Sequence, residues 1–143
     1  MSAVLLLDAA AALYMTGVIW FVQVVHYPLF DGVAAADWPA YHARHTQRTG
    51  YVVAPVMIVE LATAALLVLD RPDGVPAALA VAGLALAVAA WILTLGVATP
   101  DHGRLAGGWD ARIARRLVTV GWGRTAAWTA HAAVTLAMVA QAA

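Results

Sequence analysis

The chain has 143 residues, of which 64% are hydrophobic and only 11% are charged, and its formal net charge at pH 7 is zero. Soluble domains are typically about 45–50% apolar and about 25% charged, so this composition excludes a disordered chain, a fibrous repeat and an ordinary cytosolic enzyme. Eight basic and eight acidic residues leave no positive field for phosphate, which argues against a nucleic-acid partner. The sequence has no cysteine, which excludes disulfides, thiolate chemistry and cysteine-ligated metal centres.

Four apolar stretches are each long enough to cross a bilayer, which takes about 20 mostly apolar residues in a helix. They lie at residues 4–28, 49–69, 76–98 and 117–141. The first is a permanent span rather than a signal peptide, because no Lys or Arg precedes it and it exceeds the roughly 7–15 apolar residues of a signal sequence. All four lack strict alternation, so helices are expected. The predicted fold is all-α: one integral membrane domain over residues 1–143, an antiparallel bundle of four transmembrane helices.

The connections between these stretches differ in length and in charge. Residues 70–76 form a short turn with one arginine, whereas segments 31–48 and 99–116 are longer and belong at the opposite end of an antiparallel bundle. The two longer segments carry six arginines: Arg44, Arg48, Arg104, Arg112, Arg115 and Arg116. Because cytoplasmic loops are enriched in Lys and Arg, we expect a multi-pass protein of the inner (plasma) membrane, with both termini outside and the arginine-rich segments in the cytoplasm.

Segment 31–48 is expected to form an interfacial helix between the first two spans. Asp37 can cap its N-terminus and Pro39 suits its first turn. Such a helix can lie at headgroup level with aromatic side chains as anchors. Its aromatic and imidazole side chains share one side: Trp38, Tyr41, His42 and His45. In the same way, Asp110 is expected to cap a cytoplasmic extension of the fourth span.

Besides Asp8, taken as the edge of the first span, two charged residues fall inside the predicted spans. Glu60 lies about nine residues into the second span and Arg124 about seven residues into the fourth, so their depths agree to within a few ångströms at about 1.5 Å per residue. A charge in hydrocarbon costs several kcal/mol unless it is paired or solvated. Three interpretations stay open: a structural Glu60–Arg124 ion pair, a protonated Glu60 that donates a hydrogen bond, and a catalytic carboxylate beside an anion-binding arginine. Pro55, near Glu60, is expected to kink the helix and open room there.

Polar and aromatic residues form a stripe on each of two spans. On the fourth span, Arg124, Trp128 and His131 follow at helical spacing and share one face, and the first span carries a matching stripe. Since lipid does not tolerate such faces, both should point into the bundle, where they either bind a cofactor or hold helices together. The candidate cofactor-binding residues are Trp20, Gln23, Tyr27, Trp122, Trp128 and His131.

Four of the five histidines fall near the predicted cytoplasmic face, and the fifth, His131, lies about 20 Å from that face. Two of the four are three residues apart, a spacing at which one helix can hold a metal. Imidazole together with carboxylate suits Zn, Fe or Cu. The alternative is that these imidazoles bind backbone groups, loop carboxylates or lipid headgroups. The candidate metal ligands are His26, His42, His45 and His102.

Several motifs carry a resemblance to known proteins. They are Trp20–Phe30 (WFVQVVHYPLF), Tyr41-His42-x-x-His45, Pro55-x-Met57-x-x-Glu60, His102-x-x-Leu105 and Trp122-x-Arg124-Thr125-x-x-Trp128. Together they resemble a group of small uncharacterised bacterial four-span membrane proteins, and the resemblance covers most of the chain. In size and span order the chain is also similar to the anthrone-oxygenase-like membrane proteins. These resemblances imply a four-span membrane fold and carry over no characterised catalytic motif.

Three classes of function follow from these patterns. The first is a redox or oxygenase-like membrane enzyme that binds a lipophilic small molecule, with a metal, haem or quinone as cofactor. Its catalytic residues would be Glu60, which moves protons, Arg124, which holds an oxyanion, and His26. The second is a structural or accessory membrane protein whose polar residues only stabilise the bundle. The third is a transporter or channel component, which with four spans and no inverted repeat requires an oligomer. The expected partners are the lipid bilayer and, in an oligomer, further copies of the chain.

Overall fold

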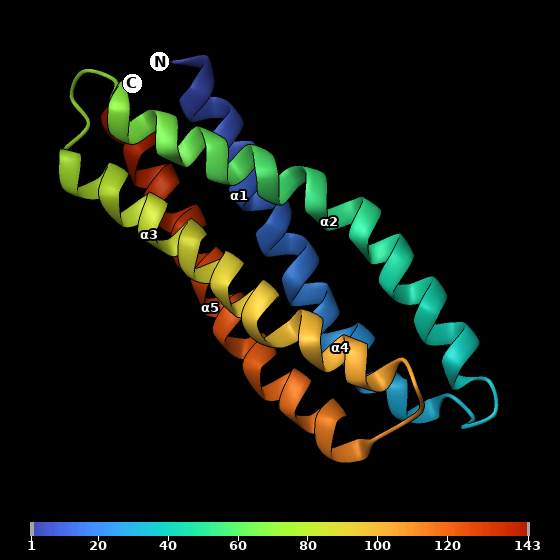
Figure 1. Cartoon of the computed structure of the whole chain (residues 1–143). Coiled ribbons are helices and arrows are strands. Elements are labelled where there is room, and N and C mark those ends of the chain that lie inside the picture. Colours follow the sequence, from blue (N-terminus) through green and yellow to red (C-terminus); the bar gives the residue numbers. More distant parts are fainter. Residues whose placement is uncertain (1, 143) are drawn as a thin grey trace.

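The computed structural model describes residues 2–142 and consists of helices (Figure 1). In chain order they are α1 (Ala3–Phe21), η1 (Val22–His26), η2 (Tyr27–Gly32), α2 (Trp38–Leu69), α3 (Ala77–Leu93), η3 (Thr94–Ala98), α4 (Thr99–Leu105) and α5 (Ala111–Gln141). Segments η1 and η3 are π-helical and η2 is a 3₁₀ helix, so each continues the helix before it. Four long helices therefore make up the bundle, which confirms the predicted all-α, four-helix architecture.

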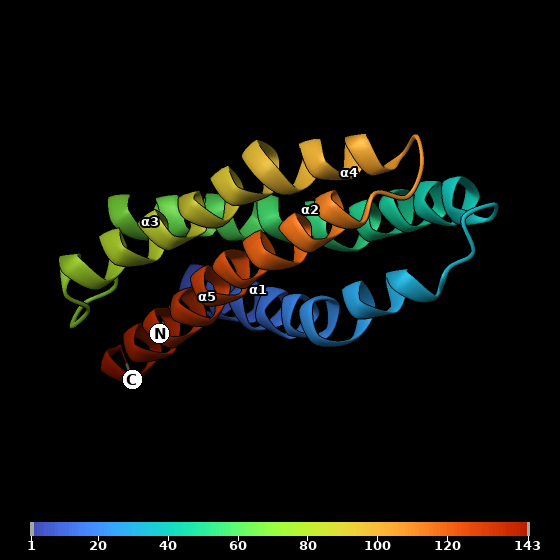
Figure 2. The same ribbon diagram turned by 90° about the horizontal axis from the view of Figure 1, so that it is seen from below.

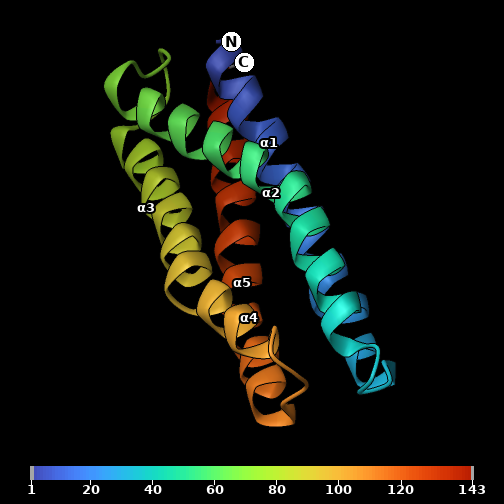
Figure 3. The same cartoon turned by 45° about the vertical axis from the view of Figure 1, so that its right-hand side comes forward.

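Each long helix packs against two neighbours. Helix α1 lies against α2 and α5, and α3 lies against the same two helices. Figure 2 shows α2 and α3 on one side of the bundle and α1 and α5 on the other. Both termini and the α2–α3 loop lie at one end, and the η2–α2 and α4–α5 connections lie at the other (Figures 1 and 3). The two arginine-rich segments therefore share one end of the bundle, as an antiparallel arrangement requires.

Within residues 2–142, three helices are long and apolar enough to cross a membrane: Ala3–Gly32, Trp38–Leu69 and Ala77–Leu105. Large apolar side chains on their surfaces are exposed, among them Leu69, Ile92 and Leu29. In water such residues would form a large apolar surface, which soluble monomers rarely show. The chain is thus a multi-pass helical protein of membrane type. Helix α5, predicted as the fourth span, falls outside this group because it begins with arginines and carries Arg124 and His131 along its length.

The interfacial helix expected between the first two spans is not a separate element in the described part of the chain. Helix α2 begins at Trp38 and continues without a break to Leu69, so residues 38–48 are its first three turns. Thr49 and Gly50 end the polar segment in the sequence, but a glycine weakens a helix by only about 1 kcal/mol and does not have to end it. The prediction of a separate helix was therefore wrong.

Asp110 caps the N-terminus of α5, as expected. Its side chain accepts hydrogen bonds from the backbone N–H groups of Arg112 at 2.8 Å and Ile113 at 3.1 Å. These backbone hydrogen bonds, first of all the one from Ile113, lower the pKa of the Asp110 carboxyl below its ordinary value of 3.8, because they stabilise the charged form. The cap sets where α5 begins and hence which of its residues face the interior.

Two π-helical turns each end at the residue before a proline. The N–H of Tyr27 closes η1 and the N–H of Thr99 closes η3, and each binds the carbonyl five residues earlier. Pro28 and Pro100 come next in the sequence. Because proline has no N–H and its ring displaces the carbonyl four residues earlier, the ordinary α-helical register cannot continue through these positions. π turns are rare and are frequent at functional sites, and both of these lie beside the histidines described below.

Apolar side chains fill the bundle in successive clusters along its length. Near the termini, the cluster includes Leu5, Leu67 and Met138; in the middle, Met15, Met57 and Trp128; at the far end, Tyr27, Phe30, Trp38, Leu105 and Leu117. The far cluster is the most aromatic of the three. It packs around the histidines at that end.

Candidate functional site

Four histidines from three helical segments meet at the end of the bundle away from the termini. His26 comes from η1, His42 and His45 from α2, and His102 from α4. Nε2 of His26 lies 2.8 Å from Nδ1 of His45, and Nε2 of His42 lies 3.1 Å from Nδ1 of His102. The ring centroid of His45 is 4.6 Å from that of His26, 5.4 Å from His102 and 6.1 Å from His42. We call these residues, all predicted as metal ligands, the four-histidine cluster.

Aromatic side chains hold this cluster in place. Phe30 packs edge-on against His26 and His45, with ring centroids at 5.2 and 5.1 Å. The fully buried Trp38 donates its Nε1–H to the carbonyl of Leu105 at 2.7 Å. That bond ties the start of α2 to the end of α4. The aromatic packing therefore fixes the relative positions of the segments that carry the imidazoles.

The two short N···N contacts restrict the protonation of the cluster. A hydrogen bond between imidazoles needs one ring nitrogen as donor and the other as acceptor, so both rings of such a pair are not protonated together. Nδ1 of His45 also lies 3.2 Å from Oγ1 of Thr49, and Nε2 of His102 lies 3.4 Å from the hydroxyl of Tyr27. Neutral imidazole is the form that ligates metals. Each pair therefore keeps at least one ring in the form that can bind a metal.

As the side chains lie, the imidazoles bind one another in pairs. No group of three or more His, Asp or Glu side chains within residues 2–142 is arranged to hold a metal ion. Nδ1 of His42 is buried and has no hydrogen-bond partner among the described residues. A buried polar atom without a partner is uncommon in proteins, and this one leaves a ligating nitrogen of the cluster free. Metal binding by these four residues stays a prediction.

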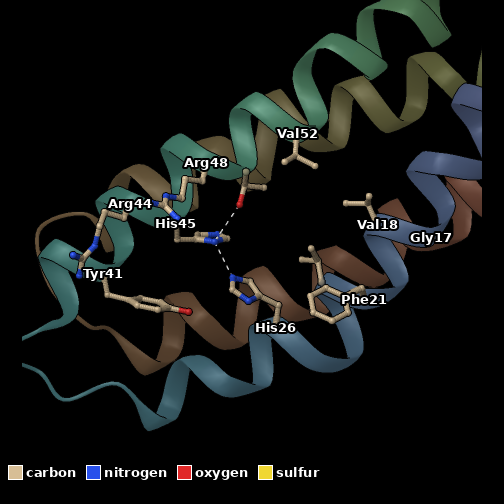
Figure 4. Close-up of a pocket in the computed structure, with 11 residues that line it drawn as sticks. Gly17, Val18, Phe21, His26, Tyr41, Arg44, His45, Arg48 and Val52 are labelled. Atoms are coloured by element: carbon tan, nitrogen blue, oxygen red, sulfur yellow. Dashed lines mark hydrogen bonds between the residues drawn. The ribbon is translucent and has the colours of Figure 1, made fainter.

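A groove lies between α1 and α2 on one side of the cluster. Its volume is about 740 Å³, and most of its lining is apolar, including Phe21 and Val52. Figure 4 shows His26 and His45 joined by their hydrogen bond at one wall, with Arg44 nearby on α2. Two histidines of the cluster, His26 and His45, are thus within reach of an apolar molecule in this groove.

A smaller inner cavity of about 210 Å³ adjoins the groove. It shares its border with the groove at four residues: Val18, Val22, His45 and Thr49. Deeper in the bundle it is lined by Tyr27, Thr94, Thr99, His102 and Arg124. The inner cavity therefore connects the four-histidine cluster with the buried arginine of α5.

Arg124 is only 7% exposed and has no carboxylate partner in the described part of the chain. Its Cζ lies 5.4 Å from the centroid of the Trp128 ring, a cation–π contact. Its Nη1 lies 3.5 Å from the hydroxyl of Tyr27, and its Nε is buried without a partner among residues 2–142. The guanidinium is therefore a buried positive charge at the border of a cavity.

No Glu60–Arg124 ion pair occurs among the described residues, so the first of the three interpretations of these residues is wrong. The Nε1–H of Trp128 donates instead to Oε2 of Glu60 at 2.9 Å, so the indole of Trp128 contacts both charged residues. Equal depth along two helices does not settle which way the side chains point around them. The three predicted catalytic residues consequently fall in different places: His26 in the cluster, Arg124 at the inner cavity and Glu60 against Trp128.

A second buried polar group of residues lies toward the termini. Oδ1 of Asp8 accepts from Oγ1 of Thr63 at 2.7 Å, and its Oδ2 accepts from Oγ1 of Thr135 at 3.2 Å and lies 3.3 Å from Nε2 of His131. All four side chains are buried, and we call them the Asp8 network. His131, predicted as a cofactor-binding residue, belongs to this network. From the sequence, Asp8 is expected at the edge of the first span. Its position as the single acid inside an apolar run, LLLDAAAAL, is the signal that could have identified it as a buried polar residue.

The other predicted cofactor-binding residues are divided between the surface and the interior. Trp20 and Trp122 are 44% and 47% exposed and pack edge-to-face with centroids 5.7 Å apart; in the described part of the chain they border neither the groove nor the inner cavity. Gln23 is buried and donates its Nε2–H to the carbonyl of Val118 at 2.8 Å. Tyr27 alone of this group lines the inner cavity, while Trp128 contacts Arg124 beside it.

Asp101 is a further buried residue that sequence reasoning did not single out. Its Oδ1 lies 2.9 Å from Nη1 of Arg104 and 3.3 Å from Nη1 of Arg116. The carboxyl group is fully buried, whereas both arginines are about half exposed. Asp101 stands next to His102, so the ion pair with Arg116 attaches the segment that carries His102 to the start of α5.

Comparison with protein-family models, with curated proteins and with solved structures finds no match for this chain. The resemblance to small four-span bacterial membrane proteins therefore stays a prediction from the motifs.

Proposed function

We propose that this chain is a multi-pass membrane protein whose four-histidine cluster binds a transition metal ion for redox or oxygenase-like chemistry on a lipophilic molecule. The observation that carries the proposal is the meeting of four imidazoles from three helical segments, with neighbouring ring centroids 4.6–6.1 Å apart. Iron and copper are the redox-active ions that imidazole ligands suit. Buried histidines that only fill space have no reason to gather in this way.

The nitrogen separations support a metal site. Imidazole nitrogens bind such ions at about 2.0–2.1 Å, so two nitrogens on one tetrahedral ion are about 3.3 Å apart. The N···N distances of 2.8 and 3.1 Å in the two histidine pairs are close to that separation. The rings would have to turn about their side-chain bonds to direct the nitrogens toward a shared ion. Tyr27, whose hydroxyl lies 3.4 Å from Nε2 of His102, would then orient that ring from outside, as outer partners of metal-bound histidines commonly do.

The surroundings of the cluster support access by a lipophilic molecule. The groove between α1 and α2 is largely apolar and reaches His26 and His45. Glu60 remains the candidate proton carrier, because its Oε1 is buried without a partner among the described residues. Arg124 remains the candidate anion-binding group, because it lines the inner cavity.

The proposed membrane topology places the cluster near the cytoplasmic face. The arginine-rich segments lie at the same end of the bundle as the cluster, and the positive-inside rule assigns that end to the cytoplasm. Helix α5 would serve as the fourth span because its polar side chains point inward: Arg124, Thr125, His131 and Thr135 are all buried. Both termini would then lie outside.

A structural role is the second candidate function, and one observation favours it. The histidines already bind one another in two pairs, and Asp101 and Asp8 are each held by nearby partners. Polar contacts of this kind can hold membrane helices together with no ligand present. In that case the four-histidine cluster would contribute to stability alone.

Metal analysis of the purified protein decides between these two functions. We expect the protein in detergent to bind about one equivalent of iron, copper or zinc, as expected of a single four-ligand site, by elemental analysis and by calorimetric titration. His45→Ala should reduce the bound metal at least tenfold, because His45 contacts or adjoins each of the other three rings. His131→Gln is the matched control, since it removes the fifth histidine, which lies outside the cluster. A wild-type protein that binds no metal even when titrated would contradict the proposal.

A further inference from the structure

Arg124 is a positive charge in the interior that lacks a counter-ion among residues 2–142. Arginine stays protonated in proteins, and burial of a charge without a partner is strongly unfavourable. The Trp128 ring and the Tyr27 hydroxyl, at 5.4 and 3.5 Å, are weak substitutes for a carboxylate. Its Nε, buried and without a partner among the described residues, is a free hydrogen-bond donor. An arginine in this situation is suited to bind an anion that comes from outside the chain.

The lining of the inner cavity matches this requirement. Around Arg124 it presents hydroxyl and imidazole groups, those of Tyr27, Thr49, Thr94, Thr99 and His102; of these, the hydroxyl of Thr94 donates to the carbonyl of Ala90 at 2.8 Å. Within the described part of the chain, no Asp or Glu borders this cavity or the groove. The space beside the guanidinium is therefore positive in potential and free of acids that would repel an anion.

The groove provides the apolar part of the same site. It is lined largely by apolar side chains from α1 and α2 and shares residues with the inner cavity. At its rim, Arg44 and Arg48 are exposed and stand one turn apart on α2 (Figure 4). Neither of them belongs to an ion pair among residues 2–142. Positive charges at the mouth of an apolar groove attract anions to it.

We propose that the groove and the inner cavity together bind a lipophilic organic acid. Its apolar part lies in the groove between α1 and α2, and its anionic head, a carboxylate or another small acidic oxygen group, lies in the inner cavity on Arg124. A small head is required because the inner cavity, at about 210 Å³, has less than a third of the volume of the groove, about 740 Å³. The inference names the kind of molecule that meets the four-histidine cluster and to that extent rests on the proposed function, but the binding itself needs no metal.

A fluorescent fatty acid tests the charge recognition directly. The probe is dansyl-labelled undecanoic acid, and its uncharged methyl ester is the comparison ligand. The protein is treated with a chelator to remove metal and is placed in phosphatidylcholine nanodiscs. We expect the acid to bind at least about tenfold more tightly than the ester, because an ion pair in a buried site adds that much or more. Arg124→Gln should remove this preference and leave ester binding unchanged, and Arg124→Lys should restore part of it. The matched control is Arg112→Gln, an exposed arginine of the same helix that borders neither space.

A second variant tests the groove without touching the arginine. No atom outside the helix's own backbone lies within 4 Å of a Cβ built at Gly17, so Gly17→Leu fits and fills part of the groove. We expect it to weaken binding of both acid and ester about tenfold or more, since the apolar part loses its place. Gly103→Leu, at an equally open glycine outside both spaces, is the control.

Equal binding of acid and ester by the wild type, or an unchanged preference in Arg124→Gln, would overturn the inference. Displacement of the probe by phosphatidylglycerol as readily as by unlabelled fatty acid would also overturn it, because a phosphodiester head is not the small acid proposed. If Arg124→Gln does not fold, two other results test the inference: the comparison of acid with ester in the wild type, and the binding of both probes by Gly17→Leu. The protein contains no metal in these binding experiments. A failed metal titration therefore does not affect the result for acid binding, and a failure of acid binding does not affect the result of the metal titration.

Discussion

The four-histidine cluster and the Asp8 network lie toward opposite ends of one bundle. The side chains of the Asp8 network are all buried, whereas in the cluster His42 and His45 are buried and His26 and His102 are half-buried. In the Asp8 network, three donors from α2 and α5 meet both oxygens of one carboxylate, at 2.7–3.3 Å. In the four-histidine cluster, the rings bind in pairs and Nδ1 of His42 is left without a partner among the described residues. A groove and an inner cavity border the cluster, whereas neither space touches Asp8, Thr63, His131 or Thr135.

This difference indicates that the Asp8 network is a structural element and that the four-histidine cluster is a candidate binding site. Burial of polar groups is common to both regions, so burial alone does not identify a binding site. What distinguishes the cluster is the space beside it together with buried nitrogen atoms that lack partners among the described residues, at His42 and at the nearby Arg124. His131 also has an unpartnered ring nitrogen within the described residues, but it borders neither the groove nor the inner cavity. We therefore treat the Asp8 network as a structural element that holds α1, α2 and α5 together.

Removal of Asp8 should have the largest effect on stability. Asp8→Ala leaves Nε2 of His131 without its partner, while the hydroxyls of Thr63 and Thr135 keep only carbonyls of their own helices, Val59 at 2.8 Å and His131 at 2.9 Å, and no longer tie α2 and α5 to α1. We expect a loss of about 2–4 kcal/mol in the free energy of unfolding, measured by denaturation in detergent. Asp8→Asn keeps the shape and one acceptor oxygen and should lose less. An Asp8→Ala protein as stable as the wild type would contradict the structural role assigned to this network.

A substitution between the two regions should have an intermediate effect. Gln23 packs directly against Gly121, and a Cβ at that glycine would collide with the carboxamide of Gln23. Gly121→Ala forces this side chain off the carbonyl of Val118, to which it donates at 2.8 Å, so we expect a loss of about 1–3 kcal/mol. Gly123→Ala is the matched control, since its Cβ would meet Leu93 at an ordinary 3.4 Å. In a double-mutant cycle, Gln23→Ala should remove most of the effect of Gly121→Ala; additive losses would speak against the contact.

The smallest effect is expected at Asp110, which belongs to neither region. Its pKa is lowered in the folded protein by the hydrogen bonds from Ile113 and Arg112, so its carboxylate stabilises the fold above the unfolded value of 3.8. That contribution is lost as the pH falls through the lower, folded pKa. Asp110→Asn keeps an acceptor at the cap but does not titrate, so its stability should fall less steeply below about pH 4 than that of the wild type. Identical pH profiles for the two proteins would contradict this assignment.

Much of the architecture could be predicted from the sequence, because it depends on one-dimensional patterns. Apolar runs separated by turn-rich or arginine-rich segments define four helices and their antiparallel order. The histidines His26, His42, His45 and His102 all stand near ends of predicted spans, and in an antiparallel bundle those ends meet. Their proximity follows from chain order alone, whereas the way their rings pair does not.

The features that could not be predicted depend on rotation about helix axes and on local backbone register. Glu60 and Arg124 have matching depths, yet Trp128 takes the position of the expected contact. Trp20 and Trp122 pack on each other at the surface instead of lining a cavity. The π turns before Pro28 and Pro100 change the direction of the following side chains. The spacing of apolar residues along the sequence does not reveal such a turn.

The most direct test of the central claim is a cobalt(II) titration of three purified proteins followed by visible absorption, with the unfolding transition recorded on metal-free portions of the same preparations. The wild type should develop the visible bands of cobalt bound by nitrogen ligands. His45→Ala should lose these bands and unfold near the wild-type midpoint, whereas Asp8→Asn should keep them and unfold at a lower denaturant concentration. That result would separate a binding cluster from a structural network. If none of the three binds cobalt, or if both variants lose stability while metal binding is unaffected, the four-histidine cluster is a structural element like the Asp8 network, and the account is wrong.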